Sequence, residues 1–97
     1  MQLLALEHEQ PGTTAFDFTL PLLRDEARTL WALVQAGIMR EAWFREDQHT
    51  AVLMLECASA KEAQAHLDTL PLVAAGLITF EVLPLTPYDG FARLFEE

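Results

Sequence analysis

The sequence predicts an α+β fold in which a four-stranded antiparallel sheet carries two helices on one face. Short apolar stretches of strand length and longer stretches of helical periodicity follow one another in the order β-α-β-β-α-β, the ferredoxin-like pattern. The two middle strands are joined only by a short polar connector, as in a hairpin. No repeat, low-complexity run or linker interrupts residues 1–97, so we expect a single domain.

The first half of the chain supplies one strand and one helix. Residues 2–8 (QLLALEH) are apolar on both faces of an extended chain, which is typical of a central strand. A helix is expected over residues 20–36, with Thr19 as its N-cap and Gly37 after its last residue. Its apolar residues recur at helical spacing and predict the face that packs on the sheet, namely Leu20, Leu23, Ala27, Leu30, Trp31 and Val34.

A hairpin is expected next. Residues 38–45 and 51–56 are both rich in apolar residues, and the polar residues 46–49 between them have the length of a hairpin connection. The second of these strands is apolar enough to be buried on both faces.

A second helix and a last strand complete the predicted fold. A capping box from Ser59 to Glu62 begins the helix, and Pro71 ends it. Residues 72–75 are expected to form a short apolar turn before the last strand, residues 78–85. Pro84 indicates that this strand lies at an edge of the sheet, because proline cannot donate a ladder hydrogen bond.

The predicted strands are apolar on both sides, whereas two helices can cover only one side of the sheet. Hydrophobic residues make up 52% of the chain, and a small chain with this composition often buries apolar surface against another copy. We therefore expect a homodimer or higher homo-oligomer joined through the open face of the sheet. The tail carries Tyr88, Phe91, Leu94 and Phe95, which are costly to leave in water. It is expected to pack on a partner subunit or on its own sheet, with a disordered end as the alternative.

Charge and cysteine content exclude several classes of function. The net charge is −9, from 15 acidic and 6 basic residues, which argues against binding to nucleic acid or to an anionic membrane. Cys57 is the single cysteine, so no intrachain disulfide is expected and a cytoplasmic protein is indicated. His8, His49 and His66 show no metal-ligand spacing, and no phosphate-binding loop is present, so we expect neither a metal nor a cofactor.

Two segments carry a resemblance to known families. Residues 59–95 resemble the C-terminal half of the YCII-related family through KEAQAHLDTL, PLVAAG and LITFEVLPL. The segment AGIMREAWFR, with Gly37, Arg40 and Trp43, resembles the muconolactone isomerase family. Both families belong to the dimeric α+β barrel group, so the resemblance implies two sheets packed face to face.

The resemblance also implies where a site would lie. Glu26 matches the glutamate on the first helix of the isomerase, while the lysine beside it in that family is Ala27 here. The aspartate of the suspected YCII acid–base pair corresponds to Leu70.

Glu26 is also unusual by its own position. On a helical wheel it falls between Leu30 and Leu33, inside the apolar arc, where a charge is costly unless it is paired or hydrated. One hypothesis is a catalytic carboxylate that faces a pocket and has a raised pKa suited to proton transfer. The other is an edge glutamate that bends into solvent or pairs with an arginine.

Arg40 and Trp43 are the candidate substrate-binding residues. The forked donors of Arg40 suit a substrate carboxylate, with a salt bridge at the strand edge as the alternative. Trp43 is expected to wall the pocket. We expect the charged groups of Glu26 and Arg40 to face one cavity, with roughly 6–10 Å between them.

Two functions therefore stay open at this point. The first is a cofactor-free isomerase or lyase acting on a small carboxylate-bearing metabolite, of the muconolactone isomerase kind. The alternative is a non-catalytic small-ligand-binding or assembly module of the YCII-related type.

Overall fold

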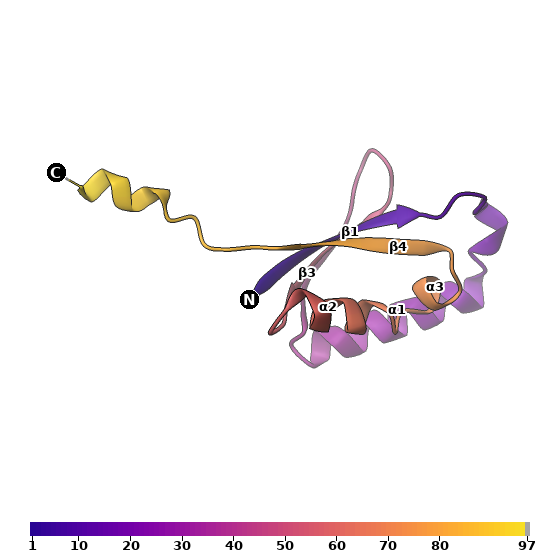
Figure 1. Cartoon of the computed structure of the whole chain (residues 1–97). Coiled ribbons are helices and arrows are strands. Elements are labelled where there is room, and N and C mark those ends of the chain that lie inside the picture. Colours follow the sequence, from indigo (N-terminus) through magenta and orange to yellow (C-terminus); the bar gives the residue numbers. More distant parts are fainter. Residues whose placement is uncertain (97) are drawn as a thin grey trace.

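The body of the molecule is a four-stranded antiparallel sheet with its helices on one face (Figure 1). The computed structural model describes residues 1–96. Its elements are β1 (Gln2–Glu9), η1 (Ala15–Asp17), α1 (Leu20–Gln35), β2 (Met39–Phe44), β3 (Ala51–Glu56), α2 (Ala60–Leu67), α3 (Pro71–Ala74), β4 (Ile78–Pro84) and η2 (Gly90–Phe95). The predicted α+β fold class is confirmed.

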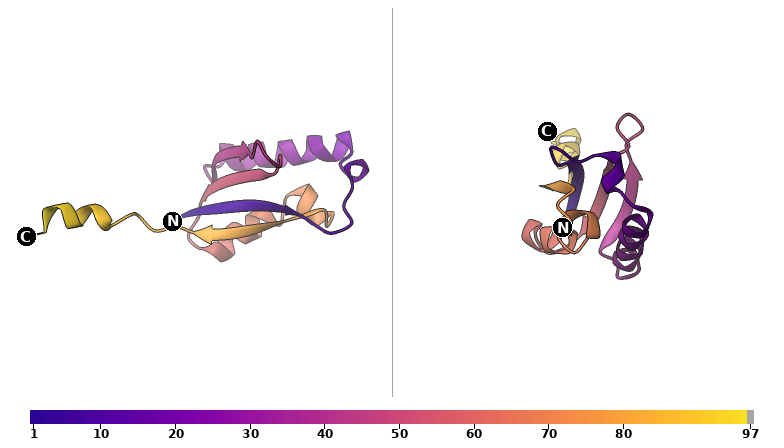
Figure 2. Two further views of the ribbon diagram at one scale, coloured as in Figure 1. Left: turned by 90° about the horizontal axis from the view of Figure 1, so that it is seen from above. Right: turned by 90° about the vertical axis from the view of Figure 1, so that its right-hand side faces the viewer.

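The strands lie in the order β2-β3-β1-β4, with every neighbouring pair antiparallel. The apolar strand β1 is therefore central, and β4 is at an edge, as Pro84 predicted. Viewed end-on in Figure 2, α1 and α2 lie on the same side of the sheet. The opposite face is covered by no other element of residues 1–96.

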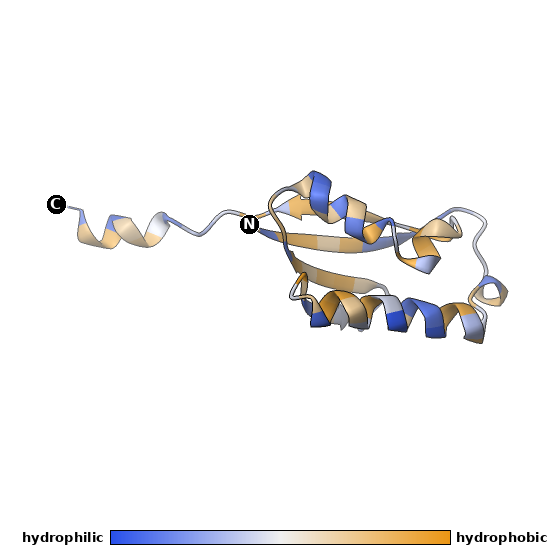
Figure 3. Ribbon diagram, turned by 90° about the horizontal axis from the view of Figure 1, so that it is seen from below, coloured by the Kyte–Doolittle hydropathy of each residue, from blue (hydrophilic) through white to orange (hydrophobic). Residues whose placement is uncertain are grey.

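Strand alternation separates the two faces of the sheet. On β1, Leu3 and Ala5 point to the helices and are fully buried, whereas Leu4 and Leu6 point to the open face and are half-buried. Figure 3 looks onto the helical side and shows mainly apolar strands behind helices that alternate apolar and polar segments. The open face therefore carries apolar side chains that a single chain leaves partly exposed.

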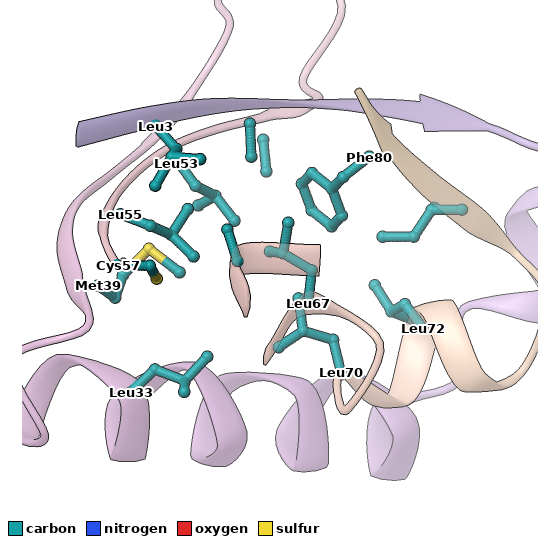
Figure 4. Close-up of a cluster of buried hydrophobic side chains, with 14 residues drawn as sticks. Leu3, Leu33, Met39, Leu53, Leu55, Cys57, Leu67, Leu70, Leu72 and Phe80 are labelled. Atoms are coloured by element: carbon teal, nitrogen blue, oxygen red, sulfur yellow. The ribbon is translucent and has the colours of Figure 1, made fainter. Parts of the chain in front are cut away.

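The core lies between the sheet and the helices. In Figure 4, Leu33 of α1 stands on one side of the cluster, opposite Leu3 and Leu53 of the sheet. The largest fully buried side chains come from all layers and are Leu3, Met39, Leu53, Leu55, Leu67, Leu70 and Ile78.

Helix α1 presents a different face to the sheet from the one predicted. Its buried residues are Glu26 and Leu33, and Leu22 and Leu30 are half-buried. The predicted contact residues Leu20 and Trp31 are both 60% exposed, and Leu23, Ala27 and Val34 are exposed as well. Of the predicted face only Leu30 packs against the core. The rest of the prediction was wrong because α1 carries two apolar stripes, and periodicity alone cannot say which one meets the core.

The segment after α2 is a short helix rather than the predicted turn. Helix α2 ends at Leu67, and Pro71 occupies the first position of α3, where its missing N–H and fixed φ favour a helix start. Leu70, just before that proline, is extended with φ −66° and ψ 131°. Gly76 then takes φ +76°, which leads the chain into β4.

The tail leaves the body altogether. Beyond β4 the chain runs outward and ends in the 3-10 helix η2, far from the helices (Figure 1). The rings of Tyr88 and Phe91 contact each other edge to face, with their centroids 4.7 Å apart, while Phe95 is 83% exposed. The tail does not pack on its own sheet, so that part of the expectation was wrong, and packing on a partner stays a prediction.

The orientation of α1 can be tested by paired substitutions. Leu33→Ala removes a buried side chain and should lower the free energy of unfolding by about 2–5 kcal/mol. Leu20→Ala changes an exposed side chain and should alter it by less than about 0.5 kcal/mol. Denaturant unfolding at several protein concentrations measures both. An equally large, concentration-independent loss in Leu20→Ala would mean that the predicted face does meet the sheet.

Candidate functional site

A cavity of about 580 Å³ lies between the first half of α1 and the sheet. Its walls come from β1, α1, β2, β3, α3 and the turn between β2 and β3. This volume falls in the range of small-molecule sites, roughly 300–1,000 Å³. Most of the wall is apolar, with the aliphatic side chains of Leu23, Leu30, Leu53 and Leu72 among its parts.

Glu26 is the most buried charged residue in the wall. Its side chain projects from the face of α1 that also carries Leu33, and it is 8% exposed. The backbone N–H of Leu72, in α3, donates a hydrogen bond to Oε1 of Glu26 at 3.0 Å. Burial raises the pKa of Glu26, this hydrogen bond lowers it, and the negative charge of Glu7 raises it. Glu26 is thus more than half buried beside a pocket, as the catalytic hypothesis required, but the expectation that this pocket is lined by polar groups was wrong.

Glu7 is a second half-buried carboxylate in the same wall, and sequence reasoning missed it. It follows Leu3 and Ala5 at the period-2 spacing of β1, which places it on the helix side of the sheet. Burial raises the pKa of Glu7, the backbone amide of Ala51 lowers it, and the charges of Glu9 and His49 act in opposite directions. The alternation of β1 was the signal that would have identified it.

Aromatic residues form another part of the wall. Trp43 and Phe44, at the end of β2, both border the cavity and remain more than half exposed. The ring of His49 stacks on Phe44 with centroids 4.2 Å apart. The indole N–H of Trp43 donates to Oε1 of Glu41 at 3.1 Å. Trp43 pairs with Val52, so its indole lies on the open face of the sheet, whereas Phe44 pairs with Ala51 on the helix side. Phe44 is therefore the aromatic residue of β2 that walls the cavity, and the expectation that the indole of Trp43 does so was wrong.

Arg40 lies elsewhere. It occupies an irregularity in the β2–β3 register, between the pairs Met39↔Leu55 and Glu41↔Met54. There its exposed side chain turns back, and Nε donates to the carbonyl oxygen of Gly37 at 2.7 Å. Arg40 does not line the cavity, so the expectation that it faces Glu26 across one cavity was wrong. The bulge redirects the side chain, and an alternating strand pattern does not reveal a bulge.

The structure offers no evident metal centre or membrane segment in the residues it describes. Among residues 1–96, no three or more His, Cys, Asp or Glu side chains are grouped as metal ligands would be. In the same range, every helix is too short or too polar to cross a bilayer.

Comparison with known proteins identifies the fold. No protein family and no curated sequence matches the chain. Among solved structures, muconolactone isomerase aligns with a TM-score of 0.71 and 18% identity, covering 92% of each chain. The 5-chloro-2-hydroxyhydroquinone dehydrochlorinase TftG from Burkholderia phenoliruptrix AC1100, in complex with 2,5-dihydroxybenzoquinone, aligns with a TM-score of 0.69 and 16% identity. That alignment covers 93% of this chain and 98% of the dehydrochlorinase. This chain therefore shares the α+β fold of both neighbours, with its four-stranded antiparallel sheet and helices.

The pKa of Glu26 predicts a dependence of stability on pH. In the folded protein Glu26 holds its proton more tightly than in the unfolded chain. Stability should therefore fall as pH rises from the ordinary carboxylate pKa through the raised pKa, and then level off. The pKa of Glu7 is also raised by burial, so Glu7 contributes a fall in stability over the same direction of pH change. Glu26→Gln removes one part of this fall, so the variant should gain stability relative to the unsubstituted chain as pH rises.

Urea unfolding from about pH 4 to about pH 8 measures this difference. Glu46→Gln, in the exposed turn after β2, is the matched control and should run parallel to the unsubstituted chain. A constant difference between Glu26→Gln and the unsubstituted chain across the range would contradict the assigned pKa shift.

Proposed function

We propose that the chain is a cofactor-independent isomerase or lyase that moves a proton on a small organic molecule held in the cavity beneath α1. Glu26 is the proposed acid/base, and Phe44 is a proposed wall of the substrate site. The observation that carries this proposal is a nearly buried carboxylate with a raised pKa in the wall of a largely apolar cavity. Such a carboxyl group exchanges protons near neutral pH more readily than an ordinary glutamate.

The hydrogen bonding of Glu26 leaves one oxygen for a ligand. The amide of Leu72 holds Oε1, and Oε2 has no hydrogen-bond partner within residues 1–96. The carboxyl group is thereby oriented by one oxygen while the other is free to take or give a proton. The names of the two structural neighbours, an isomerase and a dehydrochlorinase, support a reaction of this general type.

The proposal does not carry over the carboxylate part of the sequence-based hypothesis. That part depended on Arg40 as the anchor for a substrate acid, and Arg40 does not line the cavity. The proposed reaction is therefore proton transfer at Glu26. The class of substrate has to be inferred from the charged groups that line the cavity.

A non-catalytic small-ligand-binding module is the second candidate. It is favoured by Ala27, which stands where the isomerase family has a lysine, and by the apolar Leu70, which stands where the YCII-related family has an aspartate. A binding module needs the cavity but not the free oxygen of Glu26.

Proton exchange separates the two candidates. The chain is incubated in D2O with 5-chloro-2-hydroxyhydroquinone, the compound in one neighbour's name, and C–H exchange or turnover is followed by NMR. An enzyme should give exchange that falls about 10²–10⁴-fold in Glu26→Gln and is unchanged in Glu46→Gln. Exchange that is equal in Glu26→Gln and the unsubstituted chain would remove Glu26 as the acid/base and favour the binding module.

We also propose that the chain assembles with copies of itself. Three apolar surfaces are left uncovered by the single chain: the open face of the sheet, the outer stripe of α1 and the tail. Leu4, Val52 and Met54 on the open face are only half-buried, and they border a shallow hollow of their own. Burial of such surface against another copy is the usual solution for a small chain.

Removal of residues 88–97 should weaken this assembly, because it deletes Tyr88, Phe91, Leu94 and Phe95 together. Each large apolar side chain that becomes fully buried contributes about 1.5–3 kcal/mol. Sedimentation velocity at micromolar concentration should show a smaller species for the truncated chain. Asp89→Asn, in the same segment, is the control and should keep the mass of the full chain. A full-length chain that sediments as a stable, folded monomer would refute the proposed self-association.

A further inference from the structure

The charged groups of the cavity wall are of one sign. Three carboxylates line it: Glu7 and Glu9 from β1 and Glu26 from α1. The chain has 6 basic residues, all within residues 1–96, and none of them lines the cavity. His49 is the remaining titratable group in the wall.

The aromatic residues of the wall add to this negative character. The faces of aromatic rings are electron-rich and attract ammonium groups. Phe18 and Phe44 line the same cavity as the carboxylates, whereas the indole of Trp43 lies on the open face with its strand partner Val52. Carboxylates beside aromatic faces form the kind of surroundings that bind organic cations in water.

We propose that this cavity binds a small organic cation, a primary amine or quaternary ammonium group on an apolar body. The positive group would lie between Glu7 and Glu26, and the body would contact the aliphatic wall that includes Leu23, Leu30 and Leu53. The inference rests on the cavity named in the proposed function, but it does not require that proton transfer takes place there.

The negative charge of the cavity wall disfavours anionic and neutral ligands. An anion would have to leave water for a wall with three carboxylates and no arginine or lysine, which is strongly unfavourable. A neutral hydroxyl group can donate to Oε2 of Glu26, but it leaves the repulsion between Glu7 and Glu26 in place. A cation lowers the energy of both ionised carboxylates at once. The net charge of −9 also draws cations toward the molecule.

The cavity should bind the cation more tightly as pH rises. The groups that face it are Glu7 and Glu9 from β1, His49 from the turn after β2, and Glu26 from α1, with the backbone amides of Ala51 and Leu72 beside Glu7 and Glu26. Burial raises the pKa of Glu7 and of Glu26, so both carry protons, and lose their attraction for a cation, at a pH where ordinary glutamates are ionised.

The test uses four probes that share one benzene ring: benzyltrimethylammonium, benzylamine, benzyl alcohol and benzoate. Binding to the full chain is measured by calorimetry and by NMR shifts of the Phe18 and Phe44 rings. We expect both cations to bind about tenfold more tightly than benzyl alcohol at neutral pH, and benzoate more weakly still. Because benzyltrimethylammonium has a permanent charge, the rise in its affinity between about pH 4.5 and about pH 7.5 reports the titratable groups of the wall and not the probe.

Substitutions locate the site. Glu7→Gln and Glu26→Gln should each weaken cation binding about fivefold to tenfold while changing the affinity for benzyl alcohol by less than about twofold. Glu46→Gln, which removes a carboxylate from the exposed turn, should leave all four affinities unchanged. If Glu26→Gln does not fold, Glu7→Gln and the pH series carry the test.

Tightest binding of benzoate, equal binding of benzyl alcohol and the cations, or cation binding that neither substitution weakens would each overturn the inference. These outcomes are separate from the failure of the proposed function. Proton exchange at Glu26 without cation preference would leave the enzyme with another substrate class, whereas cation binding without exchange would leave a binding module.

Discussion

A single buried hydrogen bond, from the backbone N–H of Leu72 to Oε1 of Glu26, connects the two helical segments that close the wall of the cavity. A carboxylate this buried has a high energy unless polar groups offset the lost hydration. No arginine or lysine within residues 1–96 lies in the cavity wall to do so, which makes the amide of Leu72 the main compensation that the structure shows. Pro71 begins the short helix α3, and this helix directs the backbone N–H of Leu72 toward α1.

This bond also explains the orientation of α1. Once Glu26 faces inward, Leu22 and Leu33 share its side of the helix, and the stripe with Leu20 and Trp31 must face outward. The result is a helix that buries a carboxylate while it exposes large apolar side chains. If burial of apolar surface within the single chain were the only factor, the stripe with Leu20 and Trp31 would face the sheet and Glu26 would face solvent. The exposed stripe, together with the open face of the sheet and the projecting tail, therefore supports the proposed association with further copies.

The parts of the structure that the sequence predicted well are those set by local rules. The strand at residues 51–56 has the predicted bounds, because its alternation and its flanking turns leave little choice. The Ser59 N-cap accepts from the amide of Glu62, as the capping box required. The helical wheel placed Glu26 inside the apolar arc, although it left open whether its head group is buried or bends into solvent. Each of these depends on residues within one element.

The parts that the sequence did not predict depend on contacts between elements. The choice between two apolar stripes on α1 is made by α3 and the sheet, which are distant in sequence. The bulge at Arg40 is an irregularity between two strands, and it removes the expected anchor from the cavity. Glu7 was overlooked although the alternation of β1 identified its side, because a glutamate near a strand end is usually exposed. The charge of the cavity could be assessed only when these three placements were known together.

That charge constrains how proton transfer at Glu26 can proceed. If Glu26 removed a proton from a neutral ligand, the ligand would become an anion beside Glu7 and Glu9, with no lysine or arginine in the wall to stabilise it. If the ligand began as an ammonium ion, the same step would leave a zwitterion with no net charge, in which the positive nitrogen lies beside the new carbanion. The ligand then does not become a net anion beside Glu7 and Glu9, and its own positive charge stabilises the developing negative charge. The proposed acid/base and the proposed ligand class therefore reinforce each other, since a cationic ligand is the kind on which a carboxylate in this wall can act without a basic partner.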